Sequence, residues 1–411
     1  MRHENGSVGR AAQSLAERAV ERLPALTDAL VRTIQEENPG YRIMAVVPRD
    51  DLWRSCHDNI ARVLELIAHG VAESGTDDTD ERFDVARATG RRRAEQQMPL
   101  DDVLRSFRLG GRLVWEALIE QAHADNLADT DGLLDVATRV WEVVDATSAQ
   151  VAAAYRAAEA SLLRADAQRM AALWEGLLHG RAKDTAYAHE VSRVLGVPVE
   201  GSYVVVLADA GAGTNATQLA QLLAAQGIVS AWQVRADSLV GLLALPQPVL
   251  DETLGVLREV LTTPAGVSLV APGLVKVDTA YRQAALARRT ILGDRAEVAA
   301  LEERLVDALL LSSPELASQL VHRWLGDLLA IAPAERGMLL GTLQIWVATG
   351  GSIKDTADAA FCHRNTVINR LQRMQAITGH DFADPSCLAE VKLALRAAGL
   401  LPSPPPTQAI P

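Results

Sequence analysis

Aromatic residues, lysine and cysteine are all scarce in this 411-residue chain. Aromatic residues make up only 4% of it, and lysine occurs at four positions, so arginine supplies most of the positive charge. The three cysteines, Cys56, Cys362 and Cys387, are odd in number and far apart. They argue against a disulfide framework and favour a reducing compartment.

The chain also lacks long hydrophobic runs. No apolar run reaches 18 residues, and the N-terminus has no basic-then-apolar signal, so we expect a soluble, cytoplasmic protein. What the chain does contain is abundant Ala, Leu and Val, with 49% hydrophobic residues overall. This composition favours helices and packed interiors, and the length predicts two to three domains.

The net charge of −12 argues against a general nucleic-acid binder. Residues 362–380 are an exception, because they carry Arg364, Arg370 and Arg373 and no acidic residue. An acidic body that presents one cationic segment favours specific docking on DNA over binding by backbone charge alone. The alternative is that the acidic body simply keeps the protein soluble.

Apolar residues at helical spacing predict an all-helical first domain over residues 13–160. Its last helix continues into a connecting helix over 161–181, where apolar residues recur about every seven positions. This recurrence indicates either a coiled-coil dimer seam or an ordinary amphipathic helix packed within its own chain. The seam residues are Leu163, Ala167, Met170, Trp174 and Leu177.

The residue pattern changes after Gly180. A β-branched run at 203–208 and a hairpin formed by 229–234 and 238–245 predict strands. With intervening helices, they predict an α+β domain over 182–295, with helices on one face of a mostly antiparallel sheet. The fold class is therefore mainly α with one α+β domain. The remaining expected segments are a helical linker at 296–332, a helix-turn-helix domain at 333–400 and a disordered Pro-rich tail at 401–411.

A helix-turn-helix pattern begins at Ser352, a good N-cap with Asp355 three residues later. Ile353, Ala357 and Ala360 are expected to face inward, and Cys362-His363 forms the turn. The second helix begins near Arg364, and its apolar residues are spaced for one buried face. That face comprises Val367, Leu371, Met374 and Ile377.

The opposite face of this second helix is polar and is typical of a helix that reads a DNA major groove. Its N-terminal end supplies the base-edge candidates Arg364, Asn365, Thr366 and Asn369. We expect Arg370 and Arg373 to hold phosphates, with Ser352 and Lys354 contacting phosphate from the first helix, and His363 to cap the helix or contact phosphate. The alternative is a polar helix face that is merely solvated.

This stretch resembles the C-terminal helix-turn-helix of the PucR/CdaR family of bacterial transcriptional regulators. The residues that carry the resemblance are Thr356-Ala357, His363-Arg364-Asn365-Thr366-Val367, Arg370-Leu371, Arg373-Met374, Thr378-Gly379, and Leu393-Ala394-Leu395. The chain departs from the family pattern at Cys362, usually Val, and at Ile368-Asn369, usually Arg-Tyr. These departures put the recognised DNA sequence in question.

The rest of the chain resembles the same family more loosely. Residues 182–295 look like its GGDEF-like domain, which implies a ferredoxin-like fold, and the N-terminal helices look like an RsbR-type sensor domain. The resemblance implies an effector-responsive regulator without identifying the effector. Trp53, Trp115, Trp141 and Arg91-Arg92-Arg93 are candidate pocket residues in the first domain, although buried Trp and solvated Arg are the more usual roles.

No enzymatic motif is recognised. The hairpin Val234-Arg235-Ala236-Asp237-Ser238-Leu239 lacks the glycines and paired acids of a GGDEF cyclase turn. Asp209-Ala210-Gly211-Ala212-Gly213 is only half a phosphate loop, Cys56-His57 has no second ligand pair nearby, and Asp125, Asp129 and Asp131 lack calcium-loop spacing. We expect no catalytic residue, no metal and no cofactor.

The sequence therefore predicts a transcriptional regulator that binds double-stranded DNA as a homodimer or higher homo-oligomer and responds to a small-molecule effector. One alternative is a stressosome-like partner-switching protein with a vestigial DNA-binding domain. A weaker alternative is a nucleotide-binding or nucleotide-making enzyme that acts through the middle domain.

Overall fold

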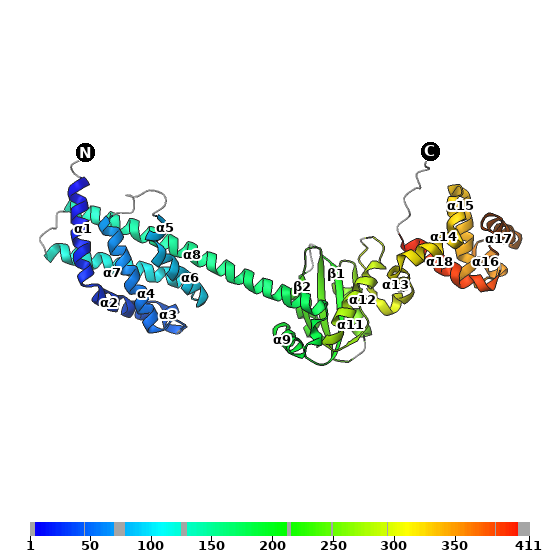
Figure 1. Cartoon of the computed structure of the whole chain (residues 1–411), viewed down its shortest axis with the longest axis horizontal. Helices are drawn as coiled ribbons and strands as arrows, with labels where there is room; N and C mark the ends of the chain where they lie inside the picture. Colours follow the sequence, from blue (N-terminus) through cyan, green and yellow to red (C-terminus); the bar gives the residue numbers. More distant parts are fainter. Residues whose placement is uncertain are drawn as a thin grey trace. The chain divides into compact units, whose positions relative to one another are not determined.

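The structure is a computed structural model in which residues 5–44, 46–69, 79–124, 130–211, 215–247, 250–293, 295–382 and 384–401 are described. The chain divides into two compact units, Met1–Arg169 and Met170–Pro411 (Figure 1). Within the described ranges, no helix has both the length and the apolar character needed to cross a membrane. The expected disordered tail falls almost wholly outside the described residues.

The first unit is all helical, as predicted. The first helix ends at Glu21, and Leu23-Pro24 begins the next one. Proline suits the first turn of a helix, where its missing N–H costs no hydrogen bond. The helices are α1 (Asn5–Glu21), α2 (Leu23–Glu37), α3 (Pro39–Ile43), α4 (Arg49–His69), α5 (Thr79–Arg82), α6 (Asp84–Glu95), α7 (Leu100–Ala124) and α8 (Thr130–Leu178).

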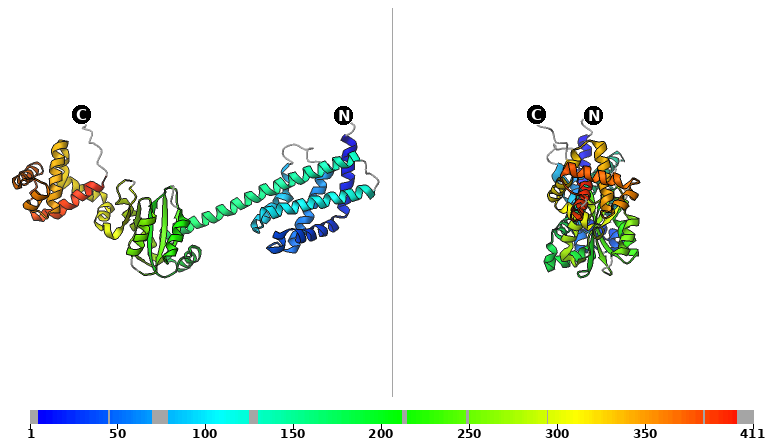
Figure 2. Two further views of the ribbon diagram at one scale, coloured as in Figure 1. Left: turned by 180° about the vertical axis from the view of Figure 1, so that it is seen from behind. Right: turned by 90° about the vertical axis from the view of Figure 1, so that its right-hand side faces the viewer.

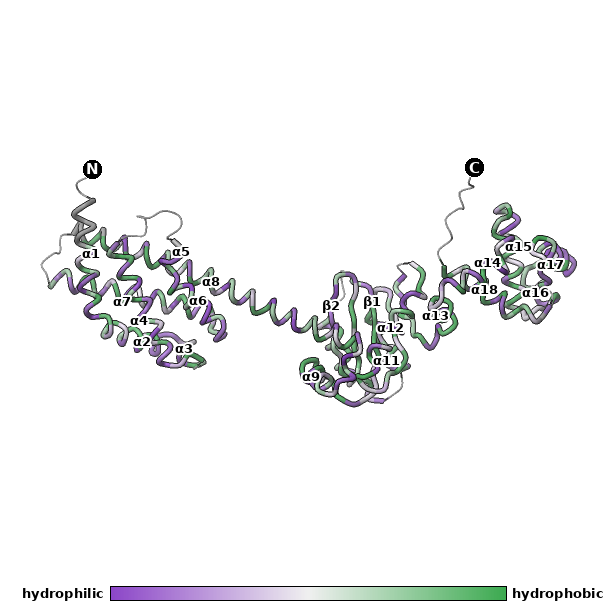
Figure 3. Tube along the Cα trace, in the orientation of Figure 1, coloured by the Kyte–Doolittle hydropathy of each residue, from purple (hydrophilic) through white to green (hydrophobic). Residues whose placement is uncertain are grey.

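The core of this unit forms where the apolar faces of α1, α2, α4, α7 and α8 meet. Ile34, Leu64 and Leu118 are almost fully buried at its centre. Hydrophobic residues appear as green bands on these helices (Figure 3). Helical spacing of apolar residues thus fixes both the existence of the helices and the side that each one buries.

Helix α8 is a single continuous helix (Figure 2). Its residues 156–169 are exposed or half-buried, and Leu163 is among the exposed ones. Further along, Trp174 and Leu177 are buried in a core with Tyr203. At these two positions the second alternative holds and the helix packs within its own chain, because the strands of the second unit cover them.

The second unit contains a six-stranded sheet of order β2-β3-β1-β4-β6, with β5 also paired to β1. The β4–β6 pair is parallel and the other pairs are antiparallel. The strands are β1 (Ser202–Asp209), β2 (Val229–Val234), β3 (Ser238–Leu245), β4 (Ala265–Val267), β5 (Ala271–Pro272) and β6 (Val298–Ala300). β6 lies in the segment expected to be a helical linker, so that expectation is wrong for Val298–Ala300.

Helices cover both faces of the sheet rather than one, which corrects the predicted layering. Tyr203 and Val205 of β1 pack towards α8, α9 (Thr185–Leu195) and α12 (Val277–Arg289). Val204 and Val206 pack on the other side with α10 (Ala216–Ala225) and α11 (Asp251–Val260). Successive side chains of a strand point to opposite faces of the sheet. A strand such as β1, with apolar residues at successive positions, is therefore buried on both faces.

The C-terminal helices are α13 (Leu305–Ser312), α14 (Pro314–Ala330), α15 (Pro333–Ala348), α16 (Ile353–Ala359), α17 (Arg364–Thr378) and α18 (Leu388–Leu400). Their shared core includes Leu328 of α14, Leu343 of α15, Val367 of α17 and Ala394 of α18. Helix α14, which the sequence suggested was linker, therefore belongs to the packing that holds α16 and α17 in place.

Candidate nucleic-acid interface

Local capping sets the ends of α16 and α17. The Ser352 hydroxyl accepts a hydrogen bond from the Asp355 amide at 3.3 Å and begins α16. At the start of α17, His363 Nδ1 accepts from the Asn365 amide at 3.2 Å, as expected of a capping residue. Gly379 ends α17 in the left-handed conformation, with φ of 73°. Such caps satisfy backbone groups that would otherwise lack partners.

The turn between the two helices is a Schellman motif, a feature that the sequence did not reveal. The Phe361 amide donates to the Asp358 carbonyl at 3.3 Å, and the Cys362 amide donates to the Ala357 carbonyl at 3.0 Å. Phe361 occupies the left-handed position, with φ of 49°, where glycine is usual. Its side chain is 97% exposed. Packing within the domain does not explain why a large apolar side chain is exposed at this position.

The inward faces largely match the prediction for α17 and only partly for α16. Val367 and Met374 are fully buried. On α16, Ala357 is buried with Thr356, whose hydroxyl lies 2.7 Å from that of Thr349. Ile353 is exposed and Ala360 only half-buried, so the expectation that these two face the core is wrong. Because α16 has only seven residues, its single buried stripe is narrow.

Six of the nine predicted DNA-contacting residues are exposed, and all nine lie on or beside α16 and α17. The exposed residues are Lys354, His363, Arg364, Asn365, Asn369 and Arg373; Ser352, Thr366 and Arg370 are half-buried. Much of the α17 tube is coloured hydrophilic (Figure 3). The side of α17 opposite its buried stripe therefore combines cationic and amide side chains that can hydrogen-bond to an external partner.

Two of the predicted phosphate contacts already have partners within the domain. The Arg370 guanidinium donates to the Thr342 hydroxyl at 3.0 Å and thereby ties α17 to α15. Arg373 pairs with Glu335 at 2.8 Å, with both side chains partly exposed. An exposed ion pair of this kind is weak, so Arg373 can exchange Glu335 for another anion at little cost. Arg370 has a structural contact that the sequence did not reveal.

Acidic side chains lie next to this surface. Asp355 and Asp358 are exposed on α16, just before the acid-free stretch that begins at residue 362. Asp355 lies in the first turn of its helix, where a carboxylate interacts favourably with the helix dipole. The cationic surface is therefore limited to α17 and the first turn of α16, which restricts the orientation in which a polyanion can approach.

Family models match three successive parts of the chain. The RsbT co-antagonist protein rsbRD N-terminal domain matches residues 24–170, a GGDEF-like domain matches 179–290, and the PucR C-terminal helix-turn-helix domain matches 339–397. The chain carries an RsbRD, a GGDEF-like and a PucR helix-turn-helix domain. The PucR match covers α16 and α17 with most of α15 and α18 but not α14, so the resemblance seen in the motif extends to part of the supporting core.

Individual relatives resemble only part of the chain. The purine catabolism regulatory protein of Bacillus subtilis (strain 168) is 37% identical over 73 residues, which are 18% of this chain and 14% of that protein. A crystal structure of a regulator of polyketide synthase expression from Bifidobacterium adolescentis is 20% identical, and the match covers 56% of this chain and 96% of that one, with a TM-score of 0.29.

In the GGDEF-like domain, one charged residue in the β2–β3 hairpin turn and one at the end of β1 form ion pairs. Arg235, in the hairpin turn, forms an ion pair with Glu175 of α8. Asp209, at the end of β1, binds Arg288 of α12 through both carboxylate oxygens. Residues 212–214 of the half phosphate loop lie outside the described residues. The described part of this domain therefore uses these charged residues to join its elements.

Proposed function

We propose that this protein is a PucR-type transcriptional regulator that binds specific DNA sequences as a homo-oligomer and responds to a small-molecule effector. The observation that carries the proposal is α17 itself. One side of it is buried in the domain core, and the other presents Arg364, Asn365 and Asn369 to solvent. A capped helix with exposed amides and arginine at its N-terminal end suits insertion into a major groove.

The residues divide into two roles in this proposal. Arg364, Asn365, Thr366 and Asn369 read base edges, because arginine pairs with guanine and asparagine with adenine in a bidentate manner. Ser352, Lys354, His363 and Arg373 contact phosphates and fix the register. Arg370 supports the helix through Thr342 and contacts phosphate only with the part of its guanidinium that this bond leaves available.

Pairing of two copies supplies the selectivity that one domain lacks. A single helix-turn-helix reads few base pairs, and two linked copies bind far more tightly than one. The exposed part of α8, with Leu162 and Leu163 on its surface, supports self-association as the means of pairing. An isolated helix of about this length is only marginally stable in water, so a second copy would also stabilise it.

Selection of binding sites from random DNA tests the proposal. We expect an enriched, two-fold symmetric site and a steep loss of affinity with salt. Arg364→Ala should weaken binding to that site by about 1–3 kcal/mol and relax the preference at one base pair. Arg289→Ala, at an exposed arginine on α12, is the matched control and should leave binding unchanged.

The competing function is partner switching by the N-terminal domain, which is supported by the match to an RsbT co-antagonist domain. In that case the selection would enrich no motif, and weak binding would be equal for all sequences and for Arg364→Ala. A sequence-selective result would favour the regulator.

A further inference from the structure

The helical first unit contains a cavity that the proposed DNA interface does not use. It has a volume of about 60 Å³ and lies between α2, α3, α4, α6, α7 and α8. By comparison, a water molecule takes a share of about 30 Å³ of the liquid, and an apolar cavity of about 150 Å³ holds benzene. The space as it stands therefore suits about two waters, and a ligand of about four to six non-hydrogen atoms requires the lining side chains to move apart.

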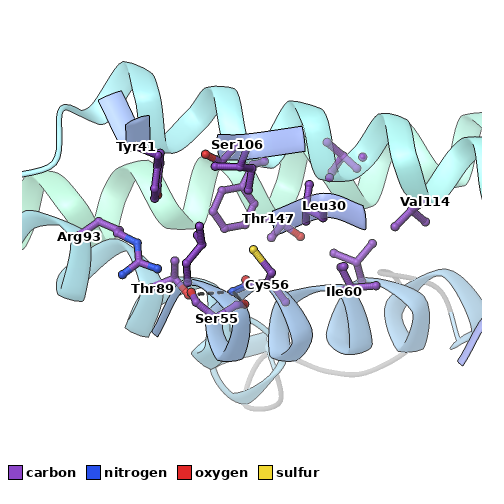
Figure 4. Close-up of a pocket in the computed structure, with 18 residues that line it drawn as sticks. Leu30, Tyr41, Ser55, Cys56, Ile60, Thr89, Arg93, Ser106, Val114 and Thr147 are labelled. Atoms are coloured by element: carbon purple, nitrogen blue, oxygen red, sulfur yellow. Dashed lines mark hydrogen bonds between the residues drawn. The ribbon is translucent and has the colours of Figure 1, made fainter. Parts of the chain in front are cut away.

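The cavity has a polar end and an apolar end (Figure 4). Arg93 and Tyr41 lie at one end, and Ile60 and Val114 lie at the other, with Leu30 between them. An occupant that has one polar head and a short apolar chain would satisfy both ends at once. If the occupant were polar along its whole length, its polar groups would lie against the apolar end of the cavity without hydrogen-bond partners, which costs free energy.

Arg93 is the residue that points to a ligand. Its side chain is only 1% exposed, and one terminal nitrogen binds Asp51 at 2.9 Å and Gln96 at 2.7 Å. Arg93 Nε, however, is fully buried and has no hydrogen-bond partner among the described residues. A buried donor left without an acceptor costs free energy, so an acceptor that arrives with a ligand would recover that cost.

Three of the hydroxyl groups that line the cavity already use their hydrogens and cannot donate to the same acceptor. The hydroxyls of Thr89, Ser106 and Thr147 each donate to the backbone carbonyl four residues earlier, at 2.9, 3.0 and 2.6 Å. A hydroxyl has a single hydrogen. The occupant must therefore bring an acceptor for Arg93 and has little need of donors.

The local charge favours an anion with a single negative charge. Asp51 binds both Arg92 and Arg93, so one carboxylate faces two guanidinium groups. Cys56 does not offset the excess, because burial raises the pKa of its thiol to about 12. Burial likewise raises the pKa of Tyr41, although Arg93 and Ser106 oppose that increase. Both groups are neutral at physiological pH, so Arg93 is the one charged group among the residues that line the cavity.

We propose that this cavity binds a small monocarboxylate, with its carboxylate at Arg93 and its short alkyl chain between Leu30, Ile60 and Val114. Such an anion pairs with Arg93 by a charge-assisted hydrogen bond, the stronger class of hydrogen bond. If the chain is a regulator as proposed above, this carboxylate is its effector, and that second statement rests on the proposed function.

The entry route runs through a polar groove on the surface. Ser55 and Thr89 line both the cavity and this groove, and their hydroxyl oxygens lie 3.3 Å apart. The groove also contains three arginines, Arg54, Arg91 and Arg92, and three acidic residues, Asp51, Asp58 and Glu95. Small rotamer changes at Ser55 and Thr89 would connect the groove with the interior.

Isothermal titration of the full chain with propanoate, butanoate, 1-butanol and butylamine tests the site. We expect butanoate to bind, 1-butanol to bind at least tenfold more weakly, and butylamine, a cation at neutral pH, not to bind. Arg93→Met should abolish butanoate binding, whereas Arg105→Met, at an exposed arginine of α7, should preserve it. Equal binding of alcohol and carboxylate, or no carboxylate binding at millimolar concentration, would overturn the proposal.

A second pair of variants covers the case in which Arg93→Met does not fold. The Cβ of Gly110→Ala would lie 3.4 Å from the nearest Leu30 atom, an ordinary contact, and would occupy part of the cavity. Gly337→Ala adds the same group to a helix where nothing lies within 4 Å. We expect Gly110→Ala to weaken butanoate binding at least threefold and Gly337→Ala to leave it unchanged. Equal affinity in both variants would refute the site.

The selected DNA site separates the two proposals. A change in its affinity upon addition of butanoate supports the effector role. If butanoate binds and no DNA site can be selected, the regulator function fails and the carboxylate site stands. If DNA binds selectively and no carboxylate binds, the cavity proposal alone fails.

Discussion

At the scale of the residue, individual side chains decide what α17 can contact. Arg364, Asn365 and Asn369 lie exposed on the outer side of this helix. The sequence pattern predicted this side for them. It could not foresee that Arg370 donates to Thr342 on α15, because helical periodicity gives the direction of a side chain and says nothing of what another element places there. The unpaired Nε of Arg93 was hidden for the same reason, since its surroundings come from other helices.

Phe361 carries a conformation that glycine adopts more easily, and this gives a test at one residue. Because Phe361 holds the left-handed position of the Schellman motif, Phe361→Gly should raise the free energy of unfolding by up to about 1 kcal/mol. If the exposed ring contacts DNA, for instance a thymine methyl group, the same change should lower DNA affinity. Chemical denaturation and DNA titration measure the two effects. An unchanged DNA affinity would remove Phe361 from the interface.

The thiols should differ in reactivity with iodoacetamide. With a pKa of about 12, Cys56 at pH 8 is a thiolate in only about one molecule in ten thousand, and it is buried. Cys362 is partly exposed and should react first. Mass spectrometry of the folded chain should show Cys56 labelling that increases as the pH rises from 8 towards 12. Labelling of Cys56 at pH 8 as fast as in the unfolded chain would contradict this assignment.

At the scale of the element, sequence patterns predicted a strand correctly where the strand that pairs with it lies close in the sequence. The hairpin of β2 and β3 has the predicted bounds, because alternation and a short turn specify both strands together. The short β6 was missed, since its three residues pair in parallel with β4, about thirty positions earlier. The sequence does not decide whether Trp174 and Leu177 pack within the chain, because a seven-residue apolar recurrence looks the same whichever surface covers it.

Self-association through α8 can be tested with two exposed leucines of the same helix. Leu163 is 66% exposed in the segment proposed to pair, and Leu134 is 61% exposed elsewhere on α8. Leu163→Glu should shift the chain from dimer to monomer, because like charges would meet across the two-fold axis, and should weaken operator binding. Leu134→Glu should do neither. Light scattering after size-exclusion chromatography measures the mass; a Leu163→Glu dimer as stable as the parent would exclude this segment.

At the scale of the whole molecule, the composition and residue patterns predicted a mainly helical chain with one α+β domain, and this is confirmed. The separate cores explain why. Leu64 lies in a helical core of the first unit, whereas Leu343 lies in the core around α17. Each core is built largely from residues near each other in sequence, so local patterns suffice to find it. The cavity beside Arg93 depends on side-chain packing among six helices, which no linear pattern specifies.

These separate cores predict unfolding in more than one step. Leu64→Ala and Leu343→Ala each truncate a fully buried leucine and should each cost about 2–5 kcal/mol. We expect differential scanning calorimetry to show that the two changes lower different transitions of the full chain. A single transition, lowered equally by both changes, would mean that the two cores unfold together.

The caps at His363 and Gly379 limit the length of α17, and under the proposed function this limits the number of base pairs that one helix can read. Three or four side chains that reach the bases specify a sequence of about four base pairs, and there are about 256 such sequences. A genome with 10⁶ to 10⁹ competing positions repeats any such short sequence thousands of times or more. One promoter must therefore be distinguished by two such short sequences at a fixed spacing. Any signal that alters the spacing between two copies of the protein would then alter which genes they regulate.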